Sequence, residues 1–224
     1  MKRVLVVSAH PDDEVLGCGG TVLKHRAAGD EVAWLIVTNA LESQGFPADA
    51  VAARQREIAE VNERFGFSRL DMLDYPTMQL DSTTLIGMVP RISKIFSEYK
   101  PEVIYVMNRS DAHSDHRIIF DAVVACTKSF RYPYVKQVLM YECLSETEFA
   151  PALPEKAFIP NYFVDVTPYH AEKLAIMGIY ASEMGEHPFP RSLRNMEALA
   201  TYRGASVGVE YAEAFQLIKF IDKA

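Results

Sequence analysis

The sequence predicts an α/β fold in which a mostly parallel sheet carries helices on both faces. Between residues 3 and 144, apolar β-branched runs of strand length alternate with stretches that have helical periodicity. This alternation is typical of parallel βαβ units. Right-handed crossovers then favour a Rossmann-like strand order, 3-2-1-4-5. The last third of the chain is less regular, and we interpret it as C-terminal additions to the same sheet.

Each element of the regular part has a local signal. Gly29 and Gly66 are expected C-caps. The run "GCGG" predicts a turn before a helix that begins at Thr21, and Pro90 predicts a kink or a later helix start. Strands are expected at 3–9, 31–38, 69–76, 101–107 and 135–144, and helices at 21–29, 47–66, 85–100 and 114–130.

The last third predicts a strand at 162–166 and helices near 169–184 and 192–204. Residues 207–220 fit either a strand or a helix. No repeat, linker or low-complexity segment interrupts the sequence, so residues 1–224 are expected to form one domain.

Composition limits the classes of function. The net charge is −7, from 23 basic and 30 acidic residues, which argues against a nucleic-acid partner. Cys18, Cys126 and Cys143 give neither a disulfide framework nor a zinc knuckle. The sequence contains no run of the roughly 20 apolar residues that a membrane span needs and no signal peptide, so we expect a cytoplasmic protein without an integral membrane segment.

Two polar clusters follow the first and the fourth predicted strands. The strand order places these two strands side by side, at the point where open α/β sheets bind ligands. The first cluster contains His10, Asp12, Asp13 and Glu14, and the second contains Asp111, His113, Asp115, His116 and Arg117.

Imidazoles and carboxylates in this arrangement are typical of a metal site. A catalytic zinc has three protein ligands and an open position, and His10, Asp13 and one imidazole of the second cluster would provide the three. The remaining carboxylate and imidazole supply a base and an oxyanion partner for hydrolysis. Taken singly, each cluster also fits a solvated turn or a helix start. The glycines lack GxGxxG spacing, which argues against a dinucleotide site.

The motifs "AHPDDEVLGCGGT" at 9–21 and "HSDH" at 113–116 resemble the PIG-L / LmbE-like family of zinc-dependent N-deacetylases. Residues 54–57, 163–184 and 203–215 are similar to later landmarks of that family, so the resemblance covers nearly the whole chain. Ser114 stands where the family motif often has proline, which affects no catalytic position.

The resemblance implies a role for each motif residue. His10, Asp13 and His116 would bind one zinc ion per chain, and Asp12 would be the general base. His113 would stabilise the oxyanion, and Asp115 would keep that imidazole charged by raising its pKa. Arg54 matches a position that contacts substrate, although a solvated helix face fits it equally well. Outside these roles, we expect Glu14 to hydrogen-bond the turn, and residues 187–192 to form a rim loop or a rigid connector.

The predicted function is therefore removal of an N-acetyl group from a GlcNAc-type amino-sugar conjugate, a small molecule. The alternatives are an amidase that cleaves another sugar-conjugate amide, and a noncatalytic metal- or sugar-binding module. Ligand type also admits iron, cobalt or manganese in place of zinc. The carrier on the sugar and a homo-oligomeric state are left open by the sequence.

Overall fold

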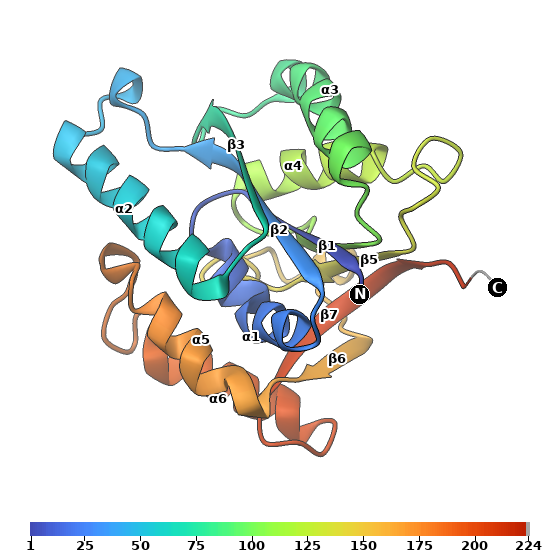
Figure 1. Ribbon diagram of the computed structural model, residues 1–224. Helices are drawn as coiled ribbons and strands as arrows, with labels where there is room; N and C mark the ends of the chain where they lie inside the picture. The colour runs from blue at the N-terminus through green and yellow to red at the C-terminus, as the bar shows by residue number, and fades with distance from the viewer. Residues whose placement is uncertain (223–224) are drawn as a thin grey trace.

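A seven-stranded sheet with the order β3-β2-β1-β4-β5-β7-β6 forms the centre of the computed structural model, which describes residues 1–222 except the side chains of residues 82 and 83 (Figure 1). The first five strands are parallel, and their order confirms the predicted 3-2-1-4-5 arrangement. Their bounds are β1 Arg3–Ser8, β2 Glu31–Asn39, β3 Arg69–Pro76, β4 Val103–Met107 and β5 Gln137–Tyr141.

Two antiparallel strands extend this sheet at the β5 edge. β7 (Ala212–Phe220) runs antiparallel to β5, and β6 (Tyr162–Asp165) pairs with β7. The segment that fitted either strand or helix is therefore mainly a strand. These two strands are the predicted C-terminal additions.

Helices cover both faces of the sheet, as predicted. Helices α1 (Asp13–Ala27), α2 (Ala48–Phe65) and α5 (His170–Met177) lie on one face, and α3 (Ser82–Tyr99) and α4 (Ser114–Ala125) lie together on the other (Figure 1). Helix α6 (Leu193–Ala205) packs against β7. β4 is buried along its whole length, and β1 is buried from its second residue onward. Within the described residues, every helix is too short or too polar to cross a membrane.

Helix α1 begins at Asp13, before the predicted start at Thr21, so the start of the helix was predicted wrongly. The predicted break is present in part, because Cys18, inside "GCGG", has φ −146° and ψ 20° and forms a kink between two helical segments. A Cβ at Gly17 would clash with the ring of Tyr141, and one at Gly20 would lie 2.7 Å from Val166. Close packing on both sides thus overrides the low helix propensity of the glycines.

Helix α3 begins eight residues before Pro90, so a later start, one of the two alternatives that Pro90 suggested, is wrong. A proline inside a helix costs about 3 kcal/mol because it removes one backbone hydrogen bond. Here the helix buries Met88, Ile92 and Phe96 completely, four residues apart on one stripe. Burial of such side chains contributes about 1.5–3 kcal/mol each, which offsets the proline.

Candidate metal centre

The carboxyl ends of β1 and β4 bring the two predicted polar clusters together. The β1 end carries His10, and the start of α4 carries His113 and His116. The ring centroid of His10 lies 4.4 Å from that of His113 and 5.5 Å from that of His116. The three imidazoles therefore share one site, although His10 is about one hundred residues away from the other two in sequence. This agrees with the rule that ligands bind at the carboxyl ends of the strands where the strand order reverses.

Asp13 is fixed by its own turn. Its Oδ2 accepts hydrogen bonds from the backbone N–H groups of Ala9 and His10, both at 2.9 Å. Its Oδ1 points the other way and lies 3.4 Å from His116 Nε2. Burial raises the pKa of Asp13, but His116 and His10 outweigh burial and bring the pKa below its ordinary value. The carboxylate is therefore held ionised and oriented.

His116 is completely buried and is oriented from behind by a carboxylate. Its Nδ1 lies 2.8 Å from Asp111 Oδ2. The other oxygen of Asp111 accepts hydrogen bonds from Asn108 Nδ2 at 2.9 Å and Thr147 Oγ1 at 2.7 Å. This chain of contacts fixes the ring and directs Nε2 towards Asp13. A carboxylate behind a histidine is the usual support of a metal-binding imidazole.

His10 has the same kind of support from Asp115. The Nε2 atom of His10 lies 3.2 Å from Asp115 Oδ2, and its Nδ1 lies 3.8 Å from Asp13 Oδ2. Asp115 Oδ2 also accepts the backbone N–H of Met78 at 2.9 Å. With Nε2 held by Asp115, the nitrogen that remains for another partner is Nδ1, on the side of Asp13.

The residues present fit a divalent metal ion. Ligand atoms of His10, Asp13 and His116 all lie within 4.8 Å of one another. The set of His10, His113 and Asp115 meets the same distance limit. Each set has a buried atom that makes no hydrogen bond within the described chain, His116 Nε2 in the first and Asp115 Oδ1 in the second. The first set is favoured because His10 Nε2 and Asp115 Oδ2 of the second set already lie 3.2 Å from each other. Two imidazoles and one carboxylate are the donor set of a catalytic zinc site.

Asp12 occupies the turn between β1 and α1 with a strained backbone. Its φ of 134° and ψ of −29° lie in a region that residues other than glycine rarely adopt. Glu14 stabilises this turn, because its Oε2 accepts the Asp12 N–H at 3.1 Å and its Oε1 accepts the Tyr180 hydroxyl at 3.0 Å. The expected structural hydrogen bond from Glu14 to the turn is thus confirmed.

Burial also changes the protonation of these two acids. It raises the pKa of Glu14 to about 8. Burial, followed by the charges of Asp13 and Glu183, raises the pKa of Asp12 well above its ordinary value, while Arg191 opposes this change. Asp12 and Asp13 are neighbours in sequence, yet their pKa values move in opposite directions.

The structure corrects one expectation about His113. Burial, followed by the nearby His10, lowers the pKa of His113 to about 4, and the raising effect of Asp115 is smaller. Asp115 Oδ2 lies 3.9 Å from His113 Nδ1, farther than from His10 Nε2. His113 Nδ1 instead accepts the backbone N–H of Asp115 at 3.1 Å. This contact leaves the hydrogen of the neutral ring on Nε2.

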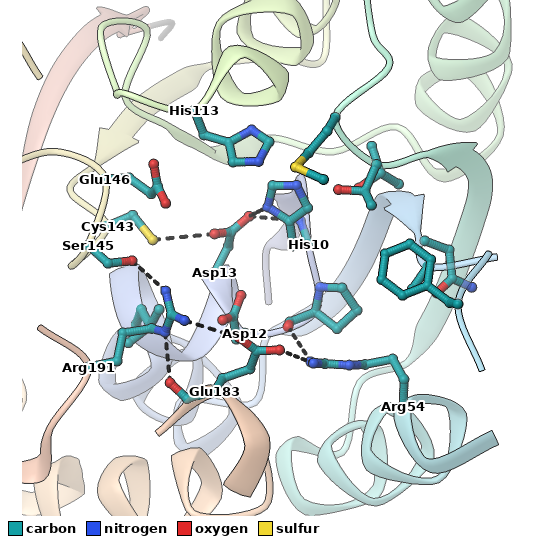
Figure 2. A pocket seen from close by; sticks show the side chains of 18 residues that line it. His10, Asp12, Asp13, Arg54, His113, Cys143, Ser145, Glu146, Glu183 and Arg191 are labelled. Carbon is teal, nitrogen blue, oxygen red and sulfur yellow. Dashed lines mark hydrogen bonds and ion pairs between the residues drawn. The ribbon is translucent and has the colours of Figure 1, made fainter. Parts of the chain in front are cut away.

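Cys143 is a site residue that sequence reasoning missed. It follows β5, is buried, and its Sγ lies 3.3 Å from Asp13 Oδ1 (Figure 2). Burial raises the pKa of this thiol well above its ordinary value, so it is a neutral S–H donor. A buried cysteine is ordinarily a packing residue, and the sequence around Cys143 carries no motif that marks it otherwise.

A pocket of about 260 Å³ opens above Asp12 and the candidate ligands. Arg54 lies in its wall, where its Nη1 donates to the Pro11 carbonyl at 3.0 Å. Arg191 also lines the pocket, so residues 187–192 contribute a residue to its rim. A rim loop was one of the two expectations for this segment, the other being a rigid connector. Figure 2 shows the carboxylate of Glu183 between the two guanidinium groups.

Residues 5–127, more than half of the chain, match the family described as "PIG-L: GlcNAc-PI de-N-acetylase". The chain belongs to the PIG-L family. It is 22% identical to a diacetylchitobiose deacetylase of Thermococcus kodakarensis, over 97% of this chain and 84% of that protein. This relative is a deacetylase, the class of enzyme that the motifs at 9–21 and 113–116 predicted.

Two solved structures show the same fold. An N,N'-diacetylchitobiose deacetylase from Pyrococcus horikoshii superposes with a TM-score of 0.76 at 22% identity, covering 97% of this chain and 84% of that chain. A 4-carboxy-2-hydroxymuconate hydratase from Pseudomonas putida superposes with a TM-score of 0.72 at 21% identity, covering 100% and 99%. Since a deacetylase and a hydratase share this fold, the reaction must be argued from the site.

Proposed function

We propose that this PIG-L family member is a hydrolase that removes the acetyl group from an N-acetyl amino-sugar conjugate of GlcNAc type. It would use one divalent ion, zinc by ligand type, held by His10, Asp13 and His116. One observation carries the proposal: two imidazoles, each backed by a carboxylate, converge on Asp13 at a pocket that Asp12 also lines.

The ion, when bound, would supply a Lewis acid that polarises the acyl oxygen and acidifies water. The remaining chemistry belongs to side chains. Asp12 lines the pocket beside Asp13, and we assign it the proton of the attacking water. As the water oxygen bonds to the amide carbon, His113 Nε2–H donates to the oxygen that gains charge. The proton held by Asp12 then passes to the nitrogen as the C–N bond breaks, which releases acetate and a free amine.

The strained turn supports this assignment. A backbone at φ 134° costs energy, and Glu14 and Tyr180 hold it in place. The turn brings Asp12 and Asp13, consecutive in sequence, to the same pocket. Separate roles for two adjacent carboxylates, one as a ligand and one as a base, require this geometry.

The alternatives predict different features. A noncatalytic metal- or sugar-binding module needs neither a base nor an oxyanion partner, whereas Asp12 and His113 both line the pocket. An amidase for another sugar-conjugate amide would share the entire catalytic set and differ at the rim. The substrate therefore has to be identified by assay.

The experiment is a panel of N-acetylated amino sugars scored for acetate release. It covers simple glycosides, sugar phosphates, sugar nucleotides and lipid-linked sugars. Each is tested with protein as purified, after chelation, and after resupply of zinc, cobalt, manganese or iron. We expect acetate from at least one class, loss of activity on chelation, and recovery with zinc.

Two outcomes would overturn the proposal. The first is full activity of protein shown by elemental analysis to be free of metal. The second is metal-dependent turnover of an unsaturated acid by addition of water, with no acetate from any N-acetyl sugar, because the fold also serves a hydratase.

A further inference from the structure

We infer that Glu183 restricts the pocket to amino-sugar conjugates whose carrier is uncharged. This inference rests on the proposed function, and it names the substrate class of the same site. Its basis is a bridge of three side chains, Arg54, Glu183 and Arg191, along the pocket wall. Figure 2 shows Asp12 between this bridge and the imidazoles of His10 and His113.

Arg54 already contacts three groups of the chain itself, one at each guanidinium nitrogen, out of its five N–H donors. Its Nη1 donates to the Pro11 carbonyl at 3.0 Å, its Nη2 pairs with Glu183 Oε1, and its Nε lies 3.4 Å from Glu57 Oε2. Its guanidinium also lies 5.5 Å from the centre of the Tyr180 ring. Every nitrogen of this arginine therefore has a partner before any substrate enters.

Arg191 is engaged in the same way. Its Nη2 donates to Glu183 Oε2 at 3.2 Å, its Nε donates to the Glu183 carbonyl at 2.8 Å, and its Nη1 donates to Ser145 Oγ at 2.6 Å. Glu183 thus uses one carboxylate oxygen for each arginine. Its side chain is only 27% exposed, so solvent screens these contacts incompletely.

The side chains that line the pocket include more carboxylates than arginines, so the charge of the pocket wall is negative. Arg54 and Arg191 are the lysine or arginine residues among the described residues that line it. Four carboxylates line it as well, those of Asp12, Asp13, Glu146 and Glu183. With all four carboxylates ionised, a divalent ion at the ligand set would bring the balance of these charges to about zero, so the wall would have no excess positive charge for an anionic carrier.

A phosphate or carboxylate that approached either arginine would lie beside the Glu183 carboxylate, which pairs with both. Like charges placed together in a binding site repel each other, so an anionic carrier is disfavoured. The rest of the wall suits an uncharged sugar. Thr38, Asn39 and Thr77 offer hydroxyl and amide groups, and Phe46 offers an aromatic face.

The test compares two probes with the same sugar and a different group at C1: methyl N-acetylglucosaminide carries an uncharged methoxy group, and N-acetylglucosamine 1-phosphate carries an anionic phosphate. For the wild-type metal-loaded enzyme, we expect kcat/KM for acetate release to favour the methyl glycoside by about tenfold or more. Glu183→Gln removes the charge that neutralises the arginines, and should reduce this preference about tenfold, mainly through KM for the phosphate. The double variant Glu183→Gln/Arg191→Gln should lose the improvement in KM for the phosphate that Glu183→Gln produces.

Glu186→Gln is the matched control, because Glu186 is an exposed glutamate in the same segment, and its selectivity should equal that of the wild type. Binding of both probes is measured by calorimetry alongside turnover. Equal or tighter binding of the phosphate by the wild-type enzyme overturns the inference. Unchanged selectivity in a folded Glu183→Gln variant also overturns it. Absence of acetate from both probes, with the binding preference intact, counts against the proposed function and leaves the selectivity inference supported.

Discussion

Two buried charged clusters flank helix α1, and they differ in one respect. The first joins Lys173 of α5 to Glu213 of β7 at 2.7 Å. Glu213 also accepts the backbone N–H groups of Gly20 and Thr21 at 2.9 and 2.7 Å. Lys173 also donates to the Leu16 carbonyl at 3.0 Å. Each charged group in this cluster has several partners within the chain.

The second cluster of this comparison lies at the start of α1 and combines the two polar clusters of the sequence motifs. Some of its buried polar atoms have no hydrogen-bond partner within the described chain. His116 Nε2 and Asp115 Oδ1 are buried without a hydrogen bond within the described chain. Asp12 and Asp13 add adjacent carboxylates and a strained backbone. Leaving buried polar groups without partners is costly, so a cluster of them indicates a site for an external partner. Both clusters bury charge, so it is the number of partners of the charged groups that separates the structural cluster from the candidate metal centre.

The largest effect should come from Asp12→Ala, which removes a carboxylate from the second cluster. If Asp12 is the base, the rate of acetate release should fall about 10²–10⁴-fold. The fold should be retained, because the variant relieves both repulsion from Asp13 and burial of charge. Steady-state kinetics and elemental analysis check this. A variant that is purified without metal would mean that Asp12, and not Asp13, is the ligand.

Breaking the first cluster should cost stability instead of rate. Lys173→Met leaves the buried Glu213 carboxylate without its cation, which costs about 3–5 kcal/mol of unfolding free energy. Lys24→Met is the control, because Lys24 also donates to a carbonyl, that of Asp165, but is exposed. Urea titration measures both variants. If Lys173→Met lowered metal content at unchanged stability, the division between the two clusters would be wrong.

Cys143→Ala should give a smaller effect that belongs to the second cluster. The thiol lies against Asp13 Oδ1, the oxygen that faces His116, so its removal lets the carboxylate turn. Loss of a group that orients a ligand weakens metal affinity about tenfold or more. Competition with a fluorescent chelator measures this. Cys143→Ser, which keeps a donor, should restore affinity, and equal affinity in the alanine variant would assign the thiol to packing alone.

The smallest effect should appear in the dependence of stability on pH. His170 is buried and stacks on Tyr211 with ring centroids 4.1 Å apart, and both its nitrogens lack a hydrogen bond within the described chain. Burial, followed by Lys173, lowers its pKa in the folded state. The unfolded histidine, with a pKa of about 6.5, binds a proton first on acidification. Stability should therefore fall as pH drops below about 6.5, by at most about 1.4 kcal/mol per pH unit.

His170→Phe should flatten this part of the pH profile while keeping the stacked ring. Chemical denaturation at several pH values measures the change. An identical slope in the variant would assign the acid sensitivity to other groups. The charged groups that also influence His170 are Glu197, Glu210 and Glu213.

Sequence patterns predicted the sheet and the meeting of the two polar clusters, because both follow from periodicity and from the rule that parallel strands end at one edge. The choice of His116 within its cluster came from the family resemblance. The start of α1 was missed because four residues of low or moderate helix propensity, "GCGG", suggested a turn. What decides the start is the fit of Gly17 and Gly20 against Tyr141 and Val166, which are distant in sequence. Such tertiary packing leaves no local signal.

The sequence offered residues 187–192 as a rim loop or a connector, but it did not indicate Cys143 or Glu183 as rim residues. Cys143 lies in the loop after β5 and Glu183 in a short 3₁₀ helix, so their backbone paths lie outside the periodic strands and α-helices. Periodicity does not encode these paths. The lowered pKa of His113 was also missed, because burial, which no sequence motif indicates, outweighs the effect of the adjacent Asp115.

The contact between Glu213 and the backbone of Gly20 has a consequence for biosynthesis. The two residues are separated by 193 positions, so a ribosome releases the first helix long before it makes the carboxylate that anchors it. Until β7 has been synthesised, Lys173 lacks its counter-ion. Helix α1, which carries Asp13, is then held only by segments that were synthesised before β7. The contacts that anchor this helix are therefore complete only late in translation, when strand β7 joins the sheet.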